Sequence, residues 1–596
     1  MAGGPYLPPF AHRRPPQRPP PSPAPPPPPH PRDHGARDRV SGRSGTYVHD
    51  RPSGRWGEAQ VQSVTAPGQA NIQAEAARRR TFAVISHPDA GKSTITEALA
   101  LHARVIGQAG AVHGKGGRRG VVSDWMAMEQ TRGISITSAA LQFAYRDVVV
   151  NLLDTPGHAD FSEDTYRVLT AVDCAVMLLD AAKGLEPQTL KLFEVCRHRR
   201  IPVVTFINKW DRPGLEPLAL LDEIETRIGL RPTPLTWPIG LAGQFHGVVD
   251  RRTGTAIHFE RAPGGATAAT EQELTTDEAA RRFGEDWQRA VEELELLDLS
   301  DADHDQATFT AATTTPVLFG AAVANLGVRQ LLDTLVELAP APGPRPDVAG
   351  EPRPVAAPFA GFVFKIQANM DPAHRDQVAF VRVCSGRFER GAQVTNGATG
   401  RPFATKYAQQ LFGRERDTAD YAYPGDVVGL VNATALGIGD TLYSDRPVEF
   451  PPLPSFAPEH FATIQTSDTS KFKRFRRGVA QLDAEGIVQV LRSEARGDAA
   501  PVLAAVGPMQ FEVATHRLAA EFGVPTTVDH LPYQYVRRTD PAGQEALSRV
   551  RGIEVLTRVR DGALLALFPN RWRLDMIARE NPTVRLDPLL ADADDR

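Results

Sequence analysis

Residues 86–94, SHPDAGKST, have types and a spacing that suit the binding of a nucleoside triphosphate. Gly91-Lys92-Ser93 matches the second half of the phosphate-loop pattern, in which Gly and four further residues precede Gly-Lys-Ser/Thr. Ser86 stands in place of the first Gly. Backbone N–H groups of such a loop can surround phosphate oxygens, Lys92 can supply positive charge, and the Ser93 hydroxyl can bind Mg²⁺. Alone, this stretch predicts a phosphate site.

A second polar stretch, residues 154–158 (DTPGH), directly follows an apolar run. Asp154 in that place can hold Mg²⁺ through water, and the N–H of Gly157 can bond to a γ-phosphate that leaves on hydrolysis. The loop could therefore sense the state of the nucleotide. The alternative for a lone DTPG sequence is an ordinary turn, and it is the phosphate loop that favours the nucleotide site.

Base selectivity is predicted from residues 208–211, NKWD. The Asp211 carboxylate can accept hydrogen bonds from N1 and N2 of guanine, whereas the lone pair at N1 of adenine would repel it. Asn208 would tie this loop to the phosphate loop, and the stem of Lys209 could lie across the base. A lone NKxD is often a turn at a helix start, but the three stretches in this order predict a GTP-binding domain.

Residues 131–137, TRGISIT, lie between the first two stretches and could reach across the nucleotide. Ser135 or Thr137 could offer a hydroxyl to Mg²⁺ in the triphosphate state only, which is the behaviour of a switch. An edge strand is the alternative for Thr137 and the residues after it.

His158 is the residue we single out for the chemical step. Phosphoryl transfer asks the protein mainly to position the attacking water and to neutralise charge. An imidazole just beyond the γ-phosphate loop could position that water. The alternative is a structural histidine that faces solvent.

The elements that must position these residues alternate between apolar strands and helices, as in a parallel sheet with crossover helices. In such a sheet the ligand lies beyond the carboxyl ends of the strands, so the three polar stretches should line one crevice. The predicted strands are 82–85, 148–153, 174–179, 203–207 and 317–319. A helix should start near Lys92.

Changes in composition divide the 596 residues into four parts. Residues 1–72 form a Pro- and Arg-rich disordered extension, for which we considered a docking tail, a targeting extension, and a dispensable leader or misassigned start, and favour the last. The fold class is α/β, a P-loop GTPase domain followed by an antiparallel β-barrel and a ferredoxin-like α/β domain. The predicted bounds are 75–345 with an insertion at about 240–310, then 355–450 and 456–596.

Charge and cysteine usage exclude several classes of function. There are 67 basic and 71 acidic residues, a net charge of −4, so bulk attraction to nucleic acid is not implied. Three cysteines without a metal-ligand pattern argue against a disulfide framework or structural zinc. We find no apolar run long enough to span a membrane. Five basic residues gather at the start of a predicted helix, where an RNA-binding face and a solvated helix face are both open readings: Lys471, Lys473, Arg474, Arg476 and Arg477.

Five stretches together, SHPDAGKST, RGISIT, DTPGHADFSEDTYR, NKWDRP and TWPIG, resemble the translational GTPases. The likeness is greatest to the bacterial peptide chain release factor 3 family, through GFVFKIQANMDPAHRDQVAFVRVCSGRFERG, GVAQLDAEGIVQVL and VGPMQFEVATHRL. It runs from about residue 75 to the C-terminus. The GTPase stretches alone would fit elongation factor G equally well, but the chain ends without its two further domains.

The resemblance implies a set of site residues. His158 would be catalytic, and the loss of a hydroxyl at Ala321 departs from the family's Ser/Thr-Ala pattern, although the N–H of Ala322 could still reach the guanine oxygen. The implied magnesium ligands are Ser93, Ser135 and Asp154. The implied nucleotide contacts are His87, Pro88, Asp89, Ala90, Gly91, Lys92, Ser93, Thr94, Asp154, Thr155, Pro156, Gly157, His158, Asn208, Lys209, Asp211, Ala321 and Ala322.

The resemblance also implies a function and partners. The expected activity is ribosome-stimulated hydrolysis of GTP to GDP and phosphate, with Mg²⁺, in a cycle that helps class I peptide release factors leave the ribosome. The sarcin-ricin loop of ribosomal RNA would activate His158. We expect a cytoplasmic monomer with no membrane or DNA partner. Two alternatives stay open: an elongation factor G-like or ribosome-protection GTPase, and a GTP-gated ribosome-binding module with little hydrolysis.

Overall fold

The computed structural model describes residues 71–103, 139–260, 269–300, 302–368, 377–412, 415–453, 456–493, 496–497 and 499–589. Residues 1–70 of the predicted N-terminal extension and residues 131–137, with Ser135 and Thr137, lie outside the described residues, whereas residue 72, the predicted end of the extension, already begins a helix. Residues from Gly68 onward belong to one compact unit. The first described element is helix α1 (Ile72–Ala77), which the sequence reading did not predict; it is capped by the Asn71 side chain, which accepts from the Gln73 N–H.

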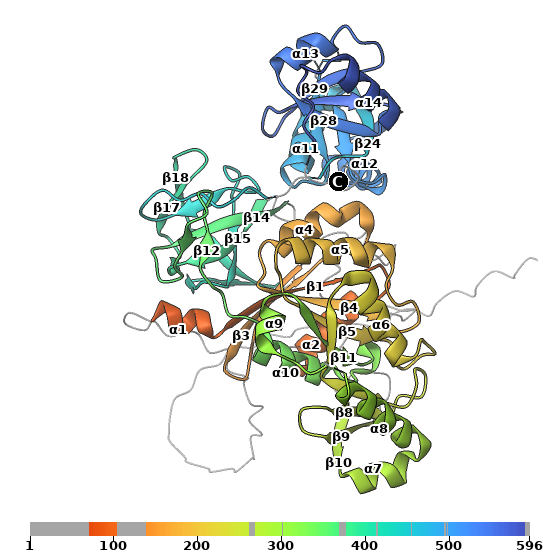
Figure 1. Cartoon of the computed structure of the whole chain (residues 1–596). Coiled ribbons are helices and arrows are strands. Elements are labelled where there is room, and N and C mark those ends of the chain that lie inside the picture. Colours follow the sequence, from red (N-terminus) through yellow and green to blue (C-terminus); the bar gives the residue numbers. More distant parts are fainter. Residues whose placement is uncertain are drawn as a thin grey trace, which may run out of the picture. The chain divides into compact units, whose positions relative to one another are not determined.

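A parallel sheet forms the core of the N-terminal domain, as predicted (Figure 1). Its strands pair in the order β3-β1-β4-β5-β11-β6, and β2 adds to β3 in the antiparallel direction. The strands are β1 (Arg79–Ser86), β2 (Ala139–Tyr145), β3 (Val148–Asp154), β4 (Cys174–Asp180), β5 (Val203–Asn208), β6 (Arg231–Pro234) and β11 (Thr314–Phe319). The predicted strands agree with the observed ones to within a few residues at each end, including the return of residues 317–319 to the sheet.

Helices cover both faces of this sheet, and so its strands are apolar at consecutive positions (Figure 1). Successive side chains of a strand point to opposite faces. In β1, Ala83 and Ile85 enter one core with α4, α5 and α6, while Phe82 and Val84 enter the other with α2 and α10. The helices are α2 (Lys92–His102), α4 (Ser162–Leu169), α5 (Pro187–His198), α6 (Pro217–Ile228) and α10 (Val328–Leu338).

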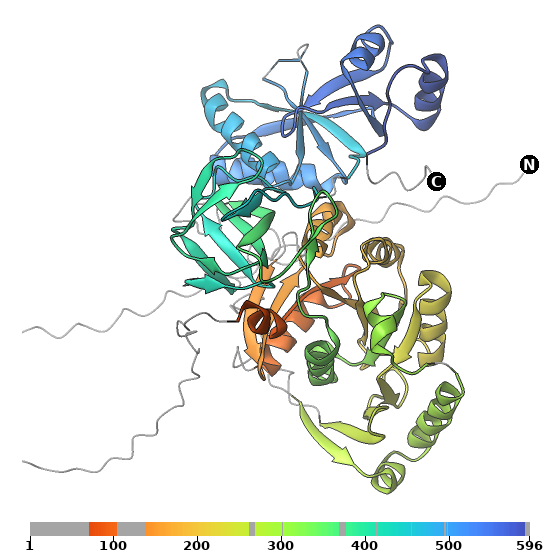
Figure 2. The same ribbon diagram turned by 60° about the vertical axis from the view of Figure 1, so that its left-hand side comes forward.

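An insertion between β6 and β11 folds around its own small sheet, in the order β10-β9-β8-β7. Helices α7 and α8 lie on one side of it (Figure 2), where Trp287 and Ala279 join the core. The sequence analysis predicted the insertion as a whole; α7 begins with a capping box between Thr275 and Glu278. The elements are β7 (Thr236–Ile239), β8 (Gly247–Asp250), β9 (Thr255–Glu260), β10 (Thr270–Leu274), α7 (Thr276–Phe283), α8 (Glu285–Asp298) and α9 (Gln306–Thr310).

The second domain is antiparallel, which confirms the predicted fold class. Its main ladder runs β18-β17-β23-β14-β15-β22-β19, with β20 paired to β19. These strands are β14 (Ala360–Ala368), β15 (Gln377–Ser385), β17 (Gln393–Asn396), β18 (Pro402–Ala404), β19 (Ala408–Phe412), β20 (Glu415–Thr418), β22 (Val427–Val431) and β23 (Thr441–Tyr443). Short pairs complete it: β12 (Arg345–Pro346) with β13 (Pro352–Arg353), and β16 (Phe388–Glu389) with β21 (Tyr421–Ala422).

The C-terminal domain begins as the predicted ferredoxin-like unit. Strands β27-β24-β26-β25 form an antiparallel sheet, and α11 and α12 bury Phe475, Leu482 and Leu518 against one face of it. Three more strands extend the same sheet beyond β25, and two helices accompany them; the sequence analysis did not distinguish this part from the ferredoxin-like unit. The elements are β24 (His460–Thr466), α11 (Phe472–Ala484), β25 (Gln489–Arg492), β26 (Val502–Ala505), α12 (Met509–Phe522), β27 (Thr526–Leu531), β28 (Tyr535–Thr539), α13 (Pro541–Leu547), β29 (Glu554–Arg558), β30 (Leu564–Phe568) and α14 (Arg571–Glu580).

Candidate functional site

The three predicted polar stretches lie at the carboxyl ends of strands β1, β3 and β5 of one parallel sheet. The phosphate loop follows β1 and leads into α2 at Lys92. Asp89 and Gly91 have φ angles of 65° and 100°, in the left-handed region. Turning the backbone in this way lets successive N–H groups point inward, as an anion-binding loop requires. Within the loop His87 and Ala90 are buried, while Thr94 lies in the first turn of α2.

Gly91 is required for a second reason besides its φ angle. A Cβ atom at Gly91 would lie 2.6 Å from Nδ2 of Asn208. That nitrogen donates a hydrogen bond of 2.7 Å to the carbonyl oxygen of Ala90. The bond shows the expected tie between residues 208–211, which we call the NKWD loop, and the phosphate loop, and it explains why no side chain fits at Gly91.

Ser86 fills the place of the first Gly with a hydroxyl that holds Lys92. The buried Lys92 Nζ donates to Ser86 Oγ at 3.0 Å and to the His87 carbonyl oxygen at 3.2 Å. Ser86 Oγ donates to the same His87 oxygen at 2.7 Å. The lysine charge is thus held inside the loop by protein oxygens that compete only weakly with the charged oxygens of a phosphate.

The loop after β3 lies beside this lysine. A Cβ atom at Gly157 would be 2.5 Å from Lys92 Nζ, so the loop can approach the lysine only because this residue has no side chain. The Thr155 hydroxyl donates to the Val84 carbonyl oxygen at 2.7 Å, and Gln188 Nε2 donates to the Gly157 oxygen at 2.9 Å. The loop is therefore held from both sides while Gly157 stays beside the lysine.

His158 follows Gly157 with its side chain 31% exposed. The Asp160 N–H lies 3.3 Å from His158 Nδ1, and the Asp160 carboxylate oxygen Oδ1 lies 3.4 Å from the same nitrogen, so Asp160 faces the Nδ1 side of the ring. The Phe161 ring stands edge-on at a centroid distance of 6.3 Å. These contacts orient the imidazole while leaving part of it accessible to water.

Two side chains of the NKWD loop, residues 208–211, differ in their hydrogen bonds: the Asn208 amide has partners, whereas one oxygen of Asp211 has none among the described residues. Asn208 Oδ1 accepts from the Ala322 N–H at 2.9 Å, so this amide links the phosphate loop to the residues after β11. The Ala322 N–H therefore holds Asn208 here, and its expected contact with guanine stays a prediction. Asp211 Oδ1 is buried and has no hydrogen-bond partner among the described residues. An orphaned buried carboxylate oxygen is costly unless a ligand supplies the donor, which fits the N–H groups of guanine.

Asp180 is a site residue that the sequence reading missed. It ends β4, and its Oδ2 accepts a hydrogen bond of 2.7 Å from Lys209 Nζ. Burial would raise the pKa of Asp180, but the Lys209 hydrogen bond and charge more than compensate, and its pKa lies below the usual value. The ion pair holds the side chain of Lys209, whose φ of 65° is also left-handed, against the carboxyl end of β4. The available signal was that Asp180, like Asp154 and Asn208, ends a buried strand.

His87 and Glu186 form a second contact beyond the prediction. His87 is fully buried, and its Nε2 lies 3.3 Å from Glu186 Oε2 without hydrogen-bond geometry. Burial lowers the pKa of His87, and the nearby Glu186 charge only partly opposes this. A neutral His87 adds no positive charge to the phosphate loop, so Lys92 is the cation that the loop provides.

The residues present also fit a magnesium ion. Asp154 is a buried carboxylate at the end of β3, and Ser93 carries a hydroxyl in the first turn of α2. Carboxylate and hydroxyl oxygens, completed by water and phosphate oxygens, are the ligands that Mg²⁺ prefers. The third predicted ligand, Ser135, lies outside the described residues. In the part of the chain that the structure describes, no group of three or more His, Cys, Asp or Glu residues is placed to hold a metal ion.

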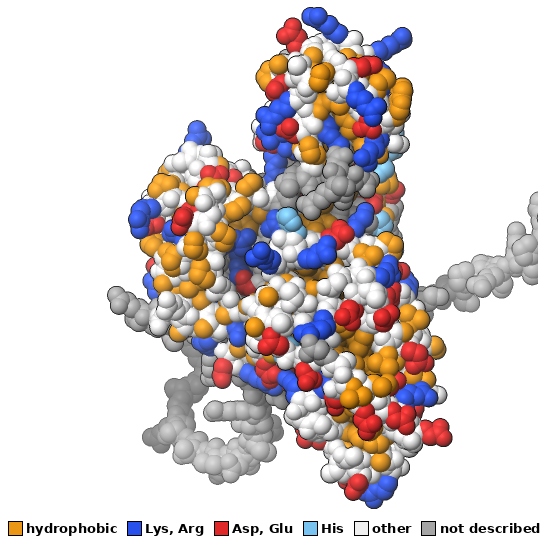
Figure 3. Space-filling model, in the orientation of Figure 1, with side chains coloured by type: hydrophobic (Ala, Val, Ile, Leu, Met, Phe, Trp, Pro, Cys, Tyr) orange, Lys and Arg blue, Asp and Glu red, His pale blue; other side chains and the backbone are white. Residues whose placement is uncertain are grey.

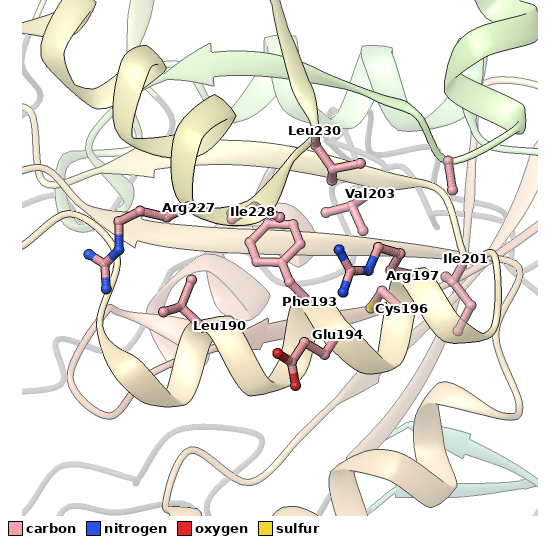
Figure 4. A pocket seen from close by; sticks show the side chains of 11 residues that line it. Leu190, Phe193, Glu194, Cys196, Arg197, Ile201, Val203, Arg227, Ile228 and Leu230 are labelled. Carbon is pink, nitrogen blue, oxygen red and sulfur yellow. The ribbon is translucent and has the colours of Figure 1, made fainter. Parts of the chain in front are cut away.

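A separate cavity of about 100 Å³ lies between α5, α6 and the start of β5 (Figure 4). Apolar residues such as Phe193 and Leu230 line it together with charged ones, among them Glu194 and Arg197, and it includes the buried Cys196. Burial raises the pKa of this thiol to about 12, which makes it unreactive. Because Val203 begins β5 and Asn208 ends it, this cavity lies at the opposite edge of the sheet from the nucleotide loops.

Three family models match the chain in succession. "Elongation factor Tu GTP binding domain" matches residues 77–341, and "Elongation factor G domain 2" matches residues 358–445. "Class II release factor RF3, C-terminal domain" matches residues 450–578. A solved protein from Thermus thermophilus has a similar fold, with a TM-score of 0.61 and 21% identity over 82% of this chain and 72% of that one.

Related proteins named peptide chain release factor 3 align with most of the chain. The one from Trichodesmium erythraeum is 47% identical over 524 residues, which cover 87% of this chain and 96% of that protein. The one from Gloeobacter violaceus is 48% identical and covers 86% and 97% of the two chains. The one from Symbiobacterium thermophilum is 46% identical and covers 85% and 96%.

Proposed function

Since this chain belongs to the peptide chain release factor 3 family, a family of translation termination GTPases, we propose that the ribosome activates its hydrolysis of GTP. We propose further that the GTP cycle promotes the departure of class I peptide release factors from the ribosome. One observation carries the proposal. Asn208 joins the phosphate loop to the loop of Ala322, and beside it Asp211 presents a buried carboxylate oxygen that has no hydrogen-bond partner among the described residues. The functional units would be those predicted at 75–345, 355–450 and 456–596.

Within this site each residue has a physical role. Lys92, released from the oxygens of Ser86 and His87, neutralises the β- and γ-phosphates together with loop N–H groups. Ser93 and Asp154, with Ser135, would hold Mg²⁺, which supplies further positive charge to the phosphates when bound. Asp211 accepts from guanine and thereby selects GTP over ATP.

His158 would position the attacking water. Its Nδ1 faces the N–H and the carboxylate of Asp160, so Nε2 is the nitrogen that remains for a water near the γ-phosphate. The partly exposed ring can be contacted from outside, and we propose that the sarcin-ricin loop of ribosomal RNA makes this contact. Activation then consists in fixing the ring in its productive orientation, because positioning dominates catalysis of phosphoryl transfer.

The experiment is GTP turnover by the wild type and by His158→Ala, each with and without ribosomes. We expect strong stimulation of the wild type and a loss of about 10²- to 10⁴-fold in the variant, the usual effect of removing a group that moves or orients a proton. GDP affinity should be unchanged. His516→Ala, at an exposed histidine of α12, is the matched control. If ribosomes did not stimulate GTP turnover by the wild type, the proposal would be wrong.

A release assay separates this proposal from the alternatives. A class I release factor bound to ribosomes after peptide release should dissociate faster with this protein and GTP, and a single turnover should show hydrolysis on the same ribosomes. Hydrolysis without release of the factor would favour an elongation-like or protection role, while release without hydrolysis would favour a gated binding module. The match of residues 450–578 to a release factor domain speaks against an elongation-like role.

We also propose that the protein works in the cytoplasm as a monomer. No helix among the described residues is long and apolar enough to cross a membrane.

A further inference from the structure

Trp572 stands exposed at the start of α14, in the last part of the C-terminal domain. Its side chain is 70% exposed, whereas Trp210, Trp237 and Trp287, the other tryptophans among the described residues, are at most 7% exposed. Helix α14 packs on the domain through Leu574 and Ile577, so Trp572 takes no part in that core. An indole that is 70% exposed contributes little to holding this helix in place.

Four arginines lie in the two chain segments that meet at the amino end of α14. Arg571 and Arg573 flank Trp572 in the first turn of α14, and the turn at residues 548–552 adds Arg549 and Arg551. The two segments meet directly, because the Arg573 guanidinium donates to the carbonyl oxygen of Arg551 at 3.0 Å. Basic side chains project from the end of the domain that carries α13 and α14 (Figure 3). We call Arg549, Arg551, Arg571, Trp572 and Arg573 the Trp572 surface.

The stability of helix α14 does not explain why arginines occupy its first turn. The amino end of a helix carries a partial positive charge that favours acidic residues, yet the first turn of α14 holds two arginines and no acidic residue. Asn570 already caps the helix by accepting the Arg573 N–H at 2.8 Å. The nearby carboxylates only partly offset the charge: Glu545 pairs with Arg549 at 3.8 Å, and Asp575 lies one turn farther along the helix.

We propose that the Trp572 surface binds an unpaired stretch of RNA, with the indole stacked on a base and the arginines facing phosphates. The inference rests on the proposed function, because ribosomal RNA is the RNA that this protein would meet. A base needs only one accessible aromatic face, and guanidinium groups complement phosphate charge. A protein partner would instead call for a contiguous apolar patch, whereas the apolar residues Leu574 and Ile577 of α14 are buried and the residue three positions after Trp572 is the exposed Asp575.

The first experiment measures the affinity of the full chain for ribosomes in the presence of a non-hydrolysable GTP analogue. Trp572→Ala should weaken binding by about 5- to 150-fold, the effect of losing one stacked base. Trp572→Phe, which keeps an aromatic face, should retain most of the affinity, and Trp572→Leu, which keeps apolar area alone, should behave like the Ala variant. Leu299→Ala, at an 87% exposed residue of the insertion, is the control for removing exposed apolar area.

The charged part of the surface is tested by the salt dependence of the same binding. Arg549→Glu/Arg551→Glu should make the decline of log K with log salt shallower by about 0.7 to 0.9 for each phosphate that the protein no longer neutralises. Unfolding midpoints should match the wild type, since both side chains are exposed. An unchanged slope and affinity in these variants, beside an unchanged Trp572→Ala, would overturn the inference.

A further experiment tests RNA binding by the Trp572 surface independently of the proposed GTPase function. Binding of the full chain to a short single-stranded RNA of mixed sequence, followed by fluorescence anisotropy, should require Trp572 even if ribosomes fail to stimulate GTP hydrolysis. If ribosomes stimulate hydrolysis and Trp572→Ala binds both RNA and ribosomes normally, the surface inference alone fails. If the variant loses affinity for a purified class I release factor but keeps RNA binding, the surface is a protein-docking site and the RNA inference is wrong.

Discussion

At the scale of single residues, two polar side chains of one loop have different functions because their hydrogen bonds differ. Both the nitrogen and the oxygen of the Asn208 amide are used, toward Ala90 and Ala322, so this residue joins loops. The Asp211 oxygen that is buried has no partner among the described residues. Leaving such an acceptor unsatisfied costs about 1 to 3 kcal/mol, which a guanine N–H would recover on binding.

Asp211→Asn should therefore weaken GTP binding by about 1.5 to 3 kcal/mol, or roughly 10- to 150-fold, because a charged acceptor of two N–H groups is lost. The new amide can donate to the second carbonyl oxygen of xanthine, so affinity for xanthosine triphosphate should rise. Calorimetric titration with both nucleotides measures the two changes. Asp222→Asn, at an exposed residue of α6, serves as control. Equal loss or gain for both nucleotides would contradict the assignment of Asp211 to the base.

At the scale of elements, the turn from β1 to α2 works only because neighbouring strands bring other loops against it. Gly91 meets Asn208 from the end of β5, and Lys92 meets Gly157 from the loop after β3. Each approach leaves no space for a Cβ atom. The phosphate loop is thus shaped by three strand ends together rather than by its own sequence.

Gly91→Ala should lower the free energy of unfolding and the affinity for GDP. A left-handed φ of 100° costs a non-glycine residue about 1 to 2 kcal/mol, and the added Cβ would displace Asn208. We expect at least about a tenfold loss of GDP affinity, measured by titration alongside urea unfolding.

Gly229→Ala separates the two effects of this substitution. Gly229 ends α6 with a φ of 73°, but a Cβ there would meet no atom within 4 Å. Its substitution should cost stability alone and leave GDP affinity unchanged. If Gly91→Ala behaved in the same way, the contact with Asn208 would have no functional role.

At the scale of the whole molecule, a net charge of −4 coexists with local basic faces. Helix α11 exposes Lys473, Arg474, Arg476 and Arg477 while it buries Phe475 on its other side. This arrangement is what an RNA-binding helix face requires, and it is also compatible with a solvated face. Local charge, not the sum, decides the attraction to a polyanion at physiological salt, because charges beyond about 10 Å are screened.

Charge reversal decides between these readings of α11. Arg476→Glu/Arg477→Glu should weaken ribosome binding and make its salt dependence shallower by roughly 1 to 2 units of log K per log salt, as expected when two phosphates are no longer neutralised. Sedimentation binding at several salt concentrations measures this slope. Arg446→Glu, at a 91% exposed side chain of the second domain, controls for charge alone. Parallel slopes for the variant and the wild type would leave α11 as a solvated face.

The sequence by itself determined the architecture and most of the nucleotide loops. Apolar runs that end in Asp154 and Asn208 had to be buried parallel strands, and carboxyl ends of parallel strands meet at one edge of a sheet. The residues predicted to contact the nucleotide could be proposed from the sequence because each motif that binds phosphate or base occupies a short, continuous stretch. Helices α1 and α7 were missed, since local caps determine them more than periodicity does.

Only the tertiary structure decided which of these side chains have hydrogen-bond partners within the protein and which are available to a ligand. Ser86 was a departure from the phosphate-loop pattern in the sequence, and the fold makes its hydroxyl an acceptor for Lys92. Asp180 had no motif, and the fold pairs it with Lys209. The same applies to the exposure of Trp572, which depends on the face that α14 turns to its core. Hydrogen-bond partners and solvent exposure arise between segments far apart in the chain, so no local pattern can specify them.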